Sequence, residues 1–380
     1  MMETEDTNKG IENDILDKHL NNIRALQVPS GLFLASRKDV STGYNKAWLR
    51  DNFYTCLAFE EIEDWETVKK VWKALLSIFI KHKEKINWAT KNKPYETYQY
   101  IHARYNPENF EEFWEEWGNK QNDAVGAILF KIGDLENKGV KIIESQEEKE
   151  ILQTLIDYLN SIEYWNDPDN GIWEEYEEVH ASSVGACVAG LKSISKTNLV
   201  KVPLHIIEKG EETLKKLLPR ESKNKFVDLA ELSLIYPFDV ISEKEGREIV
   251  RNIEYHLEKD RGIIRYKNDR YYNKNEDGVS EEAEWCFGFP WLSIIYNKWA
   301  NTMPRTSPLP TGQEDNTKKE WDEINEDTKK AQEYLQKSFK IIHKDQVPEL
   351  YYSDSDKLNE NVPLGWAESL FIVALLKTGK

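Results

Sequence analysis

Cysteine is scarce in this sequence of 380 residues. The three cysteines, Cys56, Cys187 and Cys286, lie far apart in apolar stretches and show no paired spacing. This arrangement excludes a disulfide framework and a cysteine-ligated zinc site. We expect the three thiols to be small buried hydrophobic groups in a reducing compartment, the cytoplasm.

Long hydrophobic runs and cofactor motifs are also missing. The longest apolar run, 370–376, is too short to cross a bilayer, and the polar N-terminal residues lack the apolar region of a secretory signal. The sequence contains no H-E-x-x-H motif, no glycine-rich phosphate loop and no G-x-S-x-G elbow. We therefore expect a soluble cytoplasmic protein with no metal, no cofactor and no membrane partner.

Acidic residues outnumber basic ones, 68 to 51, which gives a net charge of −17 at pH 7. Because such a surface repels phosphate backbones, nucleic acid is excluded as a partner. Thirteen Trp and eighteen Tyr supply many flat rings that can stack on sugar faces, so the composition favours a carbohydrate ligand. Nothing in the sequence indicates an oligomeric state.

Helical periodicity recurs along the whole chain, and strand-like alternation is rare. It predicts about twelve helices, near 12–27, 48–62, 64–84, 120–138, 147–162, 178–194, 202–217, 225–236, 244–257, 281–300, 323–342 and 363–378. The segment 301–320, rich in Pro, Thr and charge, is expected to be a long surface loop within one domain that covers residues 1–380.

Paired helices in this number form either an open solenoid or a closed toroid. A solenoid requires a repeat of fixed period, and the sequence has none. The long non-helical segments are 28–47, 85–119, 163–177, 259–280 and 343–362. In a toroid they gather at one end and build a pocket, so we predict an all-α, six-hairpin toroid.

The first two of these segments carry candidate binding residues. Tyr44 and Trp48 precede the pair Arg50-Asp51. This pair can form hydrogen bonds to sugar hydroxyls while an aromatic ring stacks on the sugar. An ion pair at the start of a helix, beside a Trp in the core, explains the same pattern. Trp117, beside Gly118, is a candidate to form one wall of a ligand-binding site. For Asp123, which follows in the same segment, we favour a structural role at the start of a helix.

The remaining segments carry carboxylates. Trp173 precedes Glu174 and Glu175, and an apolar ring that desolvates a carboxylate suits a general acid, although the run of glutamates also fits the first turn of a helix. Arg265 is a candidate for binding sugar hydroxyls, and an ordinary salt bridge explains it equally well. Glu349 lies between Pro348 and apolar residues, where burying a charge is costly without a purpose.

Together these segments resemble the glucoamylases, glycoside hydrolase family 15, in order and over residues 30–376. The resemblance begins at 31–36 and continues through Trp117, Gly118, Gln121 and Asp123 to the Trp-Glu-Glu run at 173–175. It implies an (α/α)₆ barrel. It also implies that substrate is bound by Tyr44, Trp48, Arg50, Asp51, Trp117, Trp173, Glu175, Arg265 and Trp366.

The same resemblance implies an inverting reaction on an α-linked glucan or oligosaccharide. Glu174 is then the general acid, and Glu349 is the base that activates water on the opposite face of the sugar. The two carboxyl groups of such a pair lie roughly 6.5–9.5 Å apart. We predict an exo-acting hydrolase that releases glucose from non-reducing ends of maltooligosaccharides, isomaltooligosaccharides or a glycogen-like glucan.

Two runs, 348–352 and 181–185, are more similar to the related domain of the α and β regulatory subunits of phosphorylase kinase, and Leu350 stands where the hydrolases usually carry Gln. A glucan-sensing domain without turnover is therefore the alternative function. A trehalase-like or uronide-processing enzyme of the same fold is a third.

Overall fold

The structure, a computed structural model, describes residues 2–115, 117–274, 281–302 and 314–379, with side chains from residue 13 onward except those of 314–321. Within this part of the chain, six elements form an inner ring in which each packs against the next. They are α2 (Leu49–Glu61), α5 (Asn122–Asn137), α7 (Ala181–Ser195), the 3-10 helix η2 (Leu229–Leu234), α10 (Gly288–Thr302) and α12 (Gly365–Thr378). The ring closes because α12 packs against α2.

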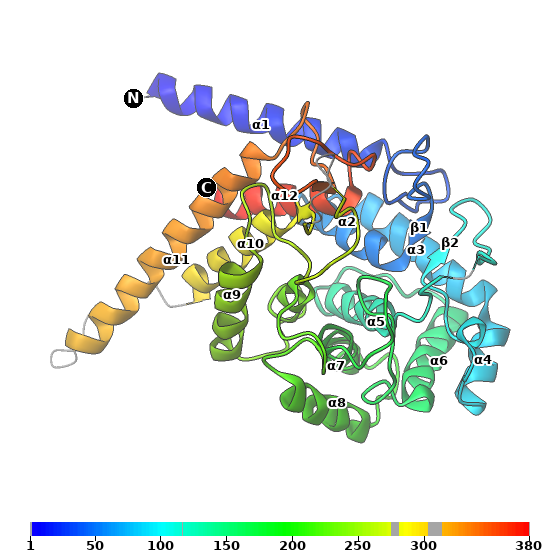
Figure 1. Ribbon diagram of the computed structural model, residues 1–380. Helices are drawn as coiled ribbons and strands as arrows, with labels where there is room; N and C mark the ends of the chain where they lie inside the picture. The colour runs from blue at the N-terminus through cyan, green and yellow to red at the C-terminus, as the bar shows by residue number, and fades with distance from the viewer. Residues whose placement is uncertain (1, 116, 275–280, 303–313, 380) are drawn as a thin grey trace.

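Outer helices alternate with the inner ones along the chain and cover the ring (Figure 1). They are α1 (Met2–Arg24), α3 (Trp65–Lys81), α6 (Gln146–Ile162), α8 (Leu204–Leu217), α9 (Glu243–Leu257) and α11 (Glu314–Lys340). The result is six helical hairpins in a closed toroid. The predicted (α/α)₆ barrel is confirmed.

Burial explains which helices lie inside. α7 and α12 are apolar nearly all round and almost wholly buried, whereas α8 and α9 bury only one face. Close approach between α5 and α7 depends on Gly190, where an added Cβ would lie 2.3 Å from the carbonyl oxygen of Gly126. The three cysteines are buried and free, as predicted.

Three predicted helices differ most from the structure. The helix predicted over 281–300 begins only at Gly288, because Glu284 and Trp285 form a short strand. The helix predicted over 64–84 is interrupted at His82, and α4 (Lys83–Lys91) continues into a segment that we expected to be non-helical; it packs against α6. The helix predicted over 225–236 is the short η2. A capping box between Asp228 and Glu231 starts it, and Pro237 disfavours helical backbone just beyond it.

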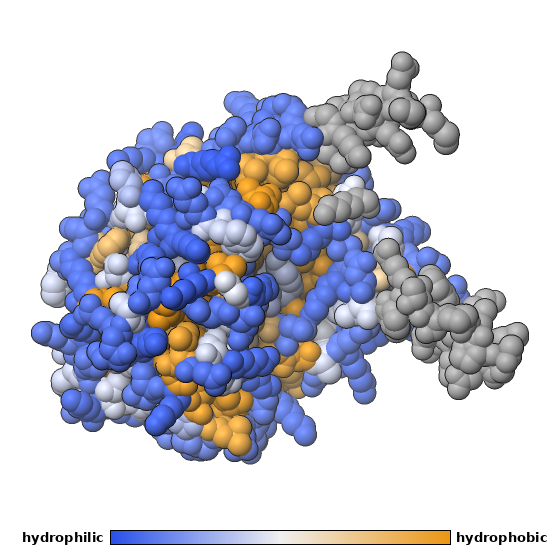
Figure 2. Space-filling model, turned by 180° about the vertical axis from the view of Figure 1, so that it is seen from behind, coloured by the Kyte–Doolittle hydropathy of each residue, from blue (hydrophilic) through white to orange (hydrophobic). Residues whose placement is uncertain are grey.

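The predicted loop at 301–320 lies largely outside the described residues; α10 ends at Thr302, and α11 already begins at Glu314. One hydrophobic cluster joins buried residues from Leu20 to Leu375, while the single-domain boundary at 1–380 stays a prediction. Hydrophilic side chains cover most of the face in Figure 2, around a smaller area of hydrophobic ones. No helix in the described ranges is long and apolar enough to cross a membrane.

Short strands join loops at one end of the ring. β1 (Ala47–Trp48) pairs antiparallel with β2 (Arg104–Tyr105), and β3 (Glu284–Trp285) pairs with β4 (Leu350–Tyr351). A 3-10 turn, η1 (Thr97–Gln99), precedes β2. These pairings hold segments together that are far apart in the sequence, and the residues predicted as a site lie on or beside them.

Candidate active site

A cavity of about 370 Å³ lies where these loops meet. All eleven residues that the sequence predicted for catalysis and binding line it: Tyr44, Trp48, Arg50, Asp51, Trp117, Trp173, Glu174, Glu175, Arg265, Glu349 and Trp366. The fold thus brings together side chains from five separate segments. Their individual roles stay predictions, and the geometry around each one follows.

The Glu174 carboxyl is held by a donor at each oxygen. Arg50 Nη2 donates to Oε1 at 3.1 Å, and the indole N–H of Trp117 donates to Oε2. The ring that bonds this carboxyl is therefore not Trp173, which we expected beside it; the Trp173 indole N–H donates to Asp228 at 2.7 Å instead. Each carboxylate oxygen keeps a second lone pair, so a proton facing the cavity is compatible with these bonds.

Backbone geometry also fixes Glu174. Its φ is +62°, in the left-handed region that non-glycine residues rarely adopt. Gly118 packs directly against it, since an added Cβ would lie 2.4 Å from the Glu174 carbonyl oxygen. The Trp117-Gly118 pair therefore has two functions: the indole bonds the carboxyl, and the missing side chain leaves room for the backbone that carries it.

The Arg50 guanidinium is held by two further side chains. Its Nη1 donates to Gln121 Oε1 at 2.7 Å and to Asp123 Oδ2 at 3.1 Å. Asp123 lies in the first turn of α5 and is buried, so its structural role includes neutralising the guanidinium. Arg50 thereby positions Glu174, in addition to the substrate contact that the sequence predicted.

Asp51 is a buried carboxyl that lines the cavity. Burial raises the pKa of Asp51 to about 7, although the neighbouring Arg50 opposes the shift. No hydrogen bond from another described side chain reaches its carboxylate. Such an acceptor is suited to sugar hydroxyls, which would satisfy it on binding.

This raised pKa predicts a pH-dependent stability effect. The Asp51 pKa is about 7 in the folded protein and 3.8 in the reference state, so its contribution is present below pH 4 and is lost as pH rises toward 7. Asp51→Asn should therefore raise Tm by roughly 2 °C or more at pH 8 and much less at pH 4.5. Thermal melts at both pH values check this, and an equal shift at both would contradict it.

Glu349 is fully buried, and only one of its oxygens is bonded. Oε2 accepts hydrogen bonds from Asn361 Nδ2 at 2.7 Å and from Asn359 Nδ2, whereas Oε1 has no partner among the described residues. Burial raises the pKa of Glu349, and its hydrogen bonds from Asn361 and Asn359 oppose the shift. A carboxylate with one unbonded oxygen, in a residue that lines a cavity, is suited to accept a proton from water.

The loop that carries Glu349 is held from several sides. Its carbonyl accepts from Cys286 N–H at 2.9 Å, next to the β3–β4 pair. Glu368 on α12 accepts from the Val347 N–H at 2.8 Å and lies 2.5 Å from the Nδ1 of His19 on α1. The first and last helices therefore fix the entry to this loop.

Glu175 and Arg265 form a second polar group at the cavity wall. Arg265 Nη2 bonds Glu175 Oε1 at 2.7 Å, and the guanidinium also makes two bonds of 2.7 and 2.6 Å to Asp269. Four aromatic rings surround the guanidinium carbon at 4.9–5.7 Å: those of Trp173, Tyr266, Tyr271 and Trp285. Arg265 is thus both ion-paired and rigidly placed, so the salt bridge and the binding of sugar hydroxyls are compatible.

Comparison with known proteins decides the family. The model of glycosyl hydrolases family 15 matches residues 13–379. The chain belongs to this family. As a family 15 member it shares its fold with a glycosidase of solved structure, at a TM-score of 0.76 and 15% identity over 97% of this chain and 98% of the other. A glucoamylase from Saccharomycopsis fibuligera matches at a TM-score of 0.67 and 15% identity, over 98% and 95% of the two chains.

The curated relatives of this family 15 chain include regulatory proteins. It is 27% identical to the probable phosphorylase b kinase regulatory subunit alpha of Drosophila melanogaster over 313 residues, which is 71% of this chain and 24% of that protein. The chain spans about a quarter of the length of the curated relatives that it matches. The resemblance to both branches of the family is thus confirmed.

Sequence reasoning missed several residues of this family 15 site. Asn359 and Asn361 bond the Glu349 carboxyl, Asp269 anchors Arg265, and Tyr271 and Tyr272 line the cavity. The only sequence signal for the first two was an Asn-Glu-Asn run shortly before Pro363 in a segment already marked as a loop. Nothing local to that run indicates which carboxylate it contacts.

Proposed function

We propose that this family 15 protein is an exo-acting, inverting hydrolase that releases glucose from the non-reducing ends of α-linked glucosides. The observation that carries the proposal is the unequal pair of carboxyls at one cavity. Glu174 is bonded by donors at both oxygens, whereas Glu349 is buried with one oxygen unbonded. An inverting mechanism needs two carboxyl groups that act separately, and the match to family 15 supports Glu174 as the acid and Glu349 as the base.

In the proposed reaction, Glu174 gives its proton to the glycosidic oxygen as the bond from that oxygen to the anomeric carbon breaks. Glu349 takes a proton from water, whose oxygen forms the new bond on the opposite face. Asp51 accepts hydroxyl donors of the terminal glucose. The small cavity and its aromatic wall support the binding of one terminal sugar, which favours exo attack.

The test measures glucose release from maltose, maltotriose, isomaltose and glycogen, and uses NMR to identify the anomer first released. We expect turnover of at least one of these substrates and β-glucose as the initial product, because inversion converts an α-linkage to a β-product. Initial release of α-glucose would contradict the inverting assignment. Turnover of trehalose in preference to the panel would assign a different hydrolase of the same fold.

Similarity to regulatory subunits favours a second function, glucan binding without turnover. Leu350, buried in β4 directly after Glu349, is the local departure from the hydrolases that accompanies this similarity. Calorimetry distinguishes the two functions. Maltooligosaccharide binding with no release of glucose from any substrate would favour the sensor and contradict hydrolysis.

A further inference from the structure

The ring of Trp117 is held from outside the hydrophobic core. Its indole N–H donates to the Glu174 carboxyl, so the orientation of the ring sets where one oxygen of the proposed general acid lies. Trp117 is nevertheless 43% exposed and lies outside the hydrophobic cluster. The Arg104 guanidinium lies over the ring, with its central carbon 4.4 Å from the ring centroid. A cation in this position is attracted to the indole and restrains it.

The Arg104 guanidinium is buried with little compensation of its charge. The residue is 3% exposed, and its side chain has one hydrogen bond among the described residues, from Nη2 to Glu115 Oε2 at 2.9 Å. The Glu115 side chain is itself exposed, and the buried Nε of Arg104 has no partner in the described part of the chain. The rings of Trp48 and Phe113 lie 5.7 Å from the guanidinium carbon. Because a buried charge with one exposed partner is costly, contact with the rings, closest at Trp117, is what this position provides.

Backbone contacts fix Arg104 itself. It lies in β2 opposite Trp48 of β1, and its N–H donates to His102 Nδ1 at 3.1 Å. Burial and the neighbouring cations lower the pKa of His102 to about 3, so the imidazole stays neutral and its Nδ1 remains an acceptor. The placement of Arg104 is therefore insensitive to pH near neutrality.

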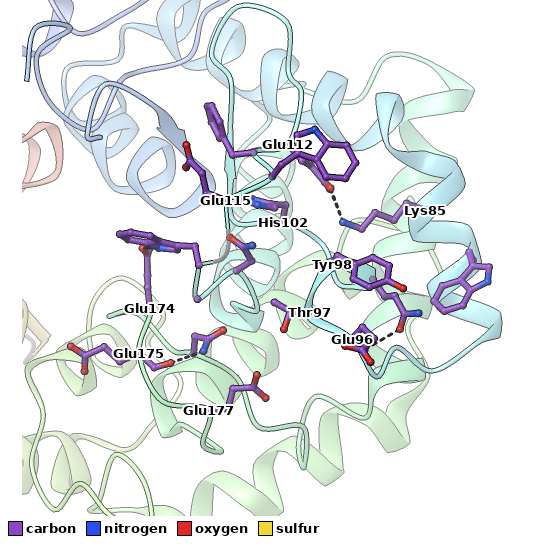
Figure 3. Close-up of a pocket in the computed structure, with 18 residues that line it drawn as sticks. Lys85, Glu96, Thr97, Tyr98, His102, Glu112, Glu115, Glu174, Glu175 and Glu177 are labelled. Atoms are coloured by element: carbon purple, nitrogen blue, oxygen red, sulfur yellow. Dashed lines mark hydrogen bonds and ion pairs between the residues drawn. The ribbon is translucent and has the colours of Figure 1, made fainter. Parts of the chain in front are cut away.

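Arg104 lies behind the cavity wall rather than in it. A second cavity, of about 820 Å³, adjoins the first and shares Trp117 and Glu174 with it. Figure 3 shows Glu115 and His102, the two partners of Arg104, among the residues along this second cavity, together with Glu174. Arg104 itself lines neither cavity. It therefore reaches a ligand in either cavity only through the Trp117 ring.

We propose that Arg104 is a positioning residue for the proposed general acid: its guanidinium holds the Trp117 indole in the orientation that bonds Glu174. The proposal rests on the proposed function, because it takes Glu174 as the acid. Two arginines then place the two oxygens of this carboxyl. Arg50 bonds Oε1 directly, and Arg104 acts on Oε2 through the indole N–H. Loss of the Arg104 cation frees the ring, so the acid spends less time in the orientation that delivers its proton to the leaving oxygen.

The test measures kcat for maltose and for α-glucosyl fluoride, whose leaving group needs little protonation, in the wild type and in Arg104→Met. Met has a similar length and no charge, so the ring loses its cation while the site stays filled. We expect kcat for maltose to fall about tenfold and kcat for the fluoride to stay within about twofold of wild type. An equal loss on both substrates, or no loss on maltose, would overturn the proposal.

Arg247→Met is the matched control. The Arg247 guanidinium lies 4.5 Å from the ring centroid of Trp299, outside both cavities, so this variant removes the same kind of contact and should leave the ratio of the two kcat values unchanged. Arg104→Lys keeps a charge near the Trp117 ring without the planar guanidinium, so it should lose only about threefold on maltose. A Lys variant no better than the Met variant would contradict a role for the cation.

An NMR measurement separates this proposal from the proposed function. In protein that contains isotope-labelled tryptophan, the Trp117 indole N–H resonance is identified by its absence from Trp117→Phe. We expect it to shift and broaden in Arg104→Met and to stay unchanged in Arg247→Met, because only the first change loosens the bond to Glu174. If the wild type turns over neither substrate, the proposed function fails, whereas an altered indole resonance would still support the positioning role. An unchanged resonance would overturn it.

Discussion

Glu174→Gln is expected to lower kcat for maltose by about 10³-fold, because a positioned general acid contributes roughly 10²–10⁴-fold. The amide cannot donate the proton that the departing sugar oxygen requires. It also places an N–H₂ group against Arg50 Nη2 or the Trp117 indole N–H, both of which donate to the carboxylate. Steady-state kinetics with thermal melts measure the loss of rate separately from any loss of stability.

The leaving group gives a sharper test of the acid role. α-Glucosyl fluoride needs little protonation of its leaving group, so Glu174→Gln should lose far less activity on it than on maltose. Equal losses on both substrates would remove Glu174 from the acid role. Glu178→Gln is the matched control from the same acidic run, since Glu178 accepts a hydrogen bond from Asn224 and lies outside the cavity that Glu174 lines; it should stay within about twofold of wild type.

Glu349→Gln is expected to lower kcat on maltose and on α-glucosyl fluoride by a similar factor, about 10³-fold, because activation of water is needed for both. The amide fits the site without conflict: its oxygen can accept from Asn359 and Asn361, and its N–H₂ group takes the place of the unbonded Oε1. Binding of maltose, measured by calorimetry, should change little.

Stability and pH distinguish this prediction from a folding defect. Because burial raises the Glu349 pKa in the folded protein, its ionised form lowers stability as pH rises, and Glu349→Gln should raise Tm at pH 7. Wild-type kcat/KM should fall as pH drops through the raised pKa, and the variant should lack this acid limb. Glu360→Gln, on the same loop but bonded to Tyr272, is the control. A lower Tm in Glu349→Gln would contradict the argument.

The sequence predicted the ring of hairpins because periodicity is a local signal. Inner helices such as α7 and α12 are apolar all round, and their boundaries agree with the prediction within a few residues. Failure occurred where periodicity alone does not decide the type and length of a helix. At 225–236 the apolar pattern suited a full helix, whereas the structure has only the short 3-10 helix η2, which starts after the capping box of Asp228 and Glu231 and ends before Pro237.

The site was predicted as a set of residues rather than as a set of contacts. The motifs identified eleven residues that all line one cavity in the structure. They also led us to expect the Trp173 ring beside the Glu174 carboxyl, whereas the ring that bonds this carboxyl is that of Trp117. The partners of Glu349 lie ten and twelve residues further along the chain and depend on how that loop turns back. Such pairings are absent from local patterns because they are set by loop geometry.

The link from His19 through Glu368 to Val347 has a consequence for synthesis of the protein. It joins positions 349 residues apart, and α12 closes the ring against α2. During translation, the proposed base can reach its final geometry only after α12 has emerged from the ribosome and packed against α1 and α2, which are synthesised much earlier. In the proposed reaction, a nascent chain that already displays Glu174 is therefore inert toward glucan, and competence for that reaction follows ring closure.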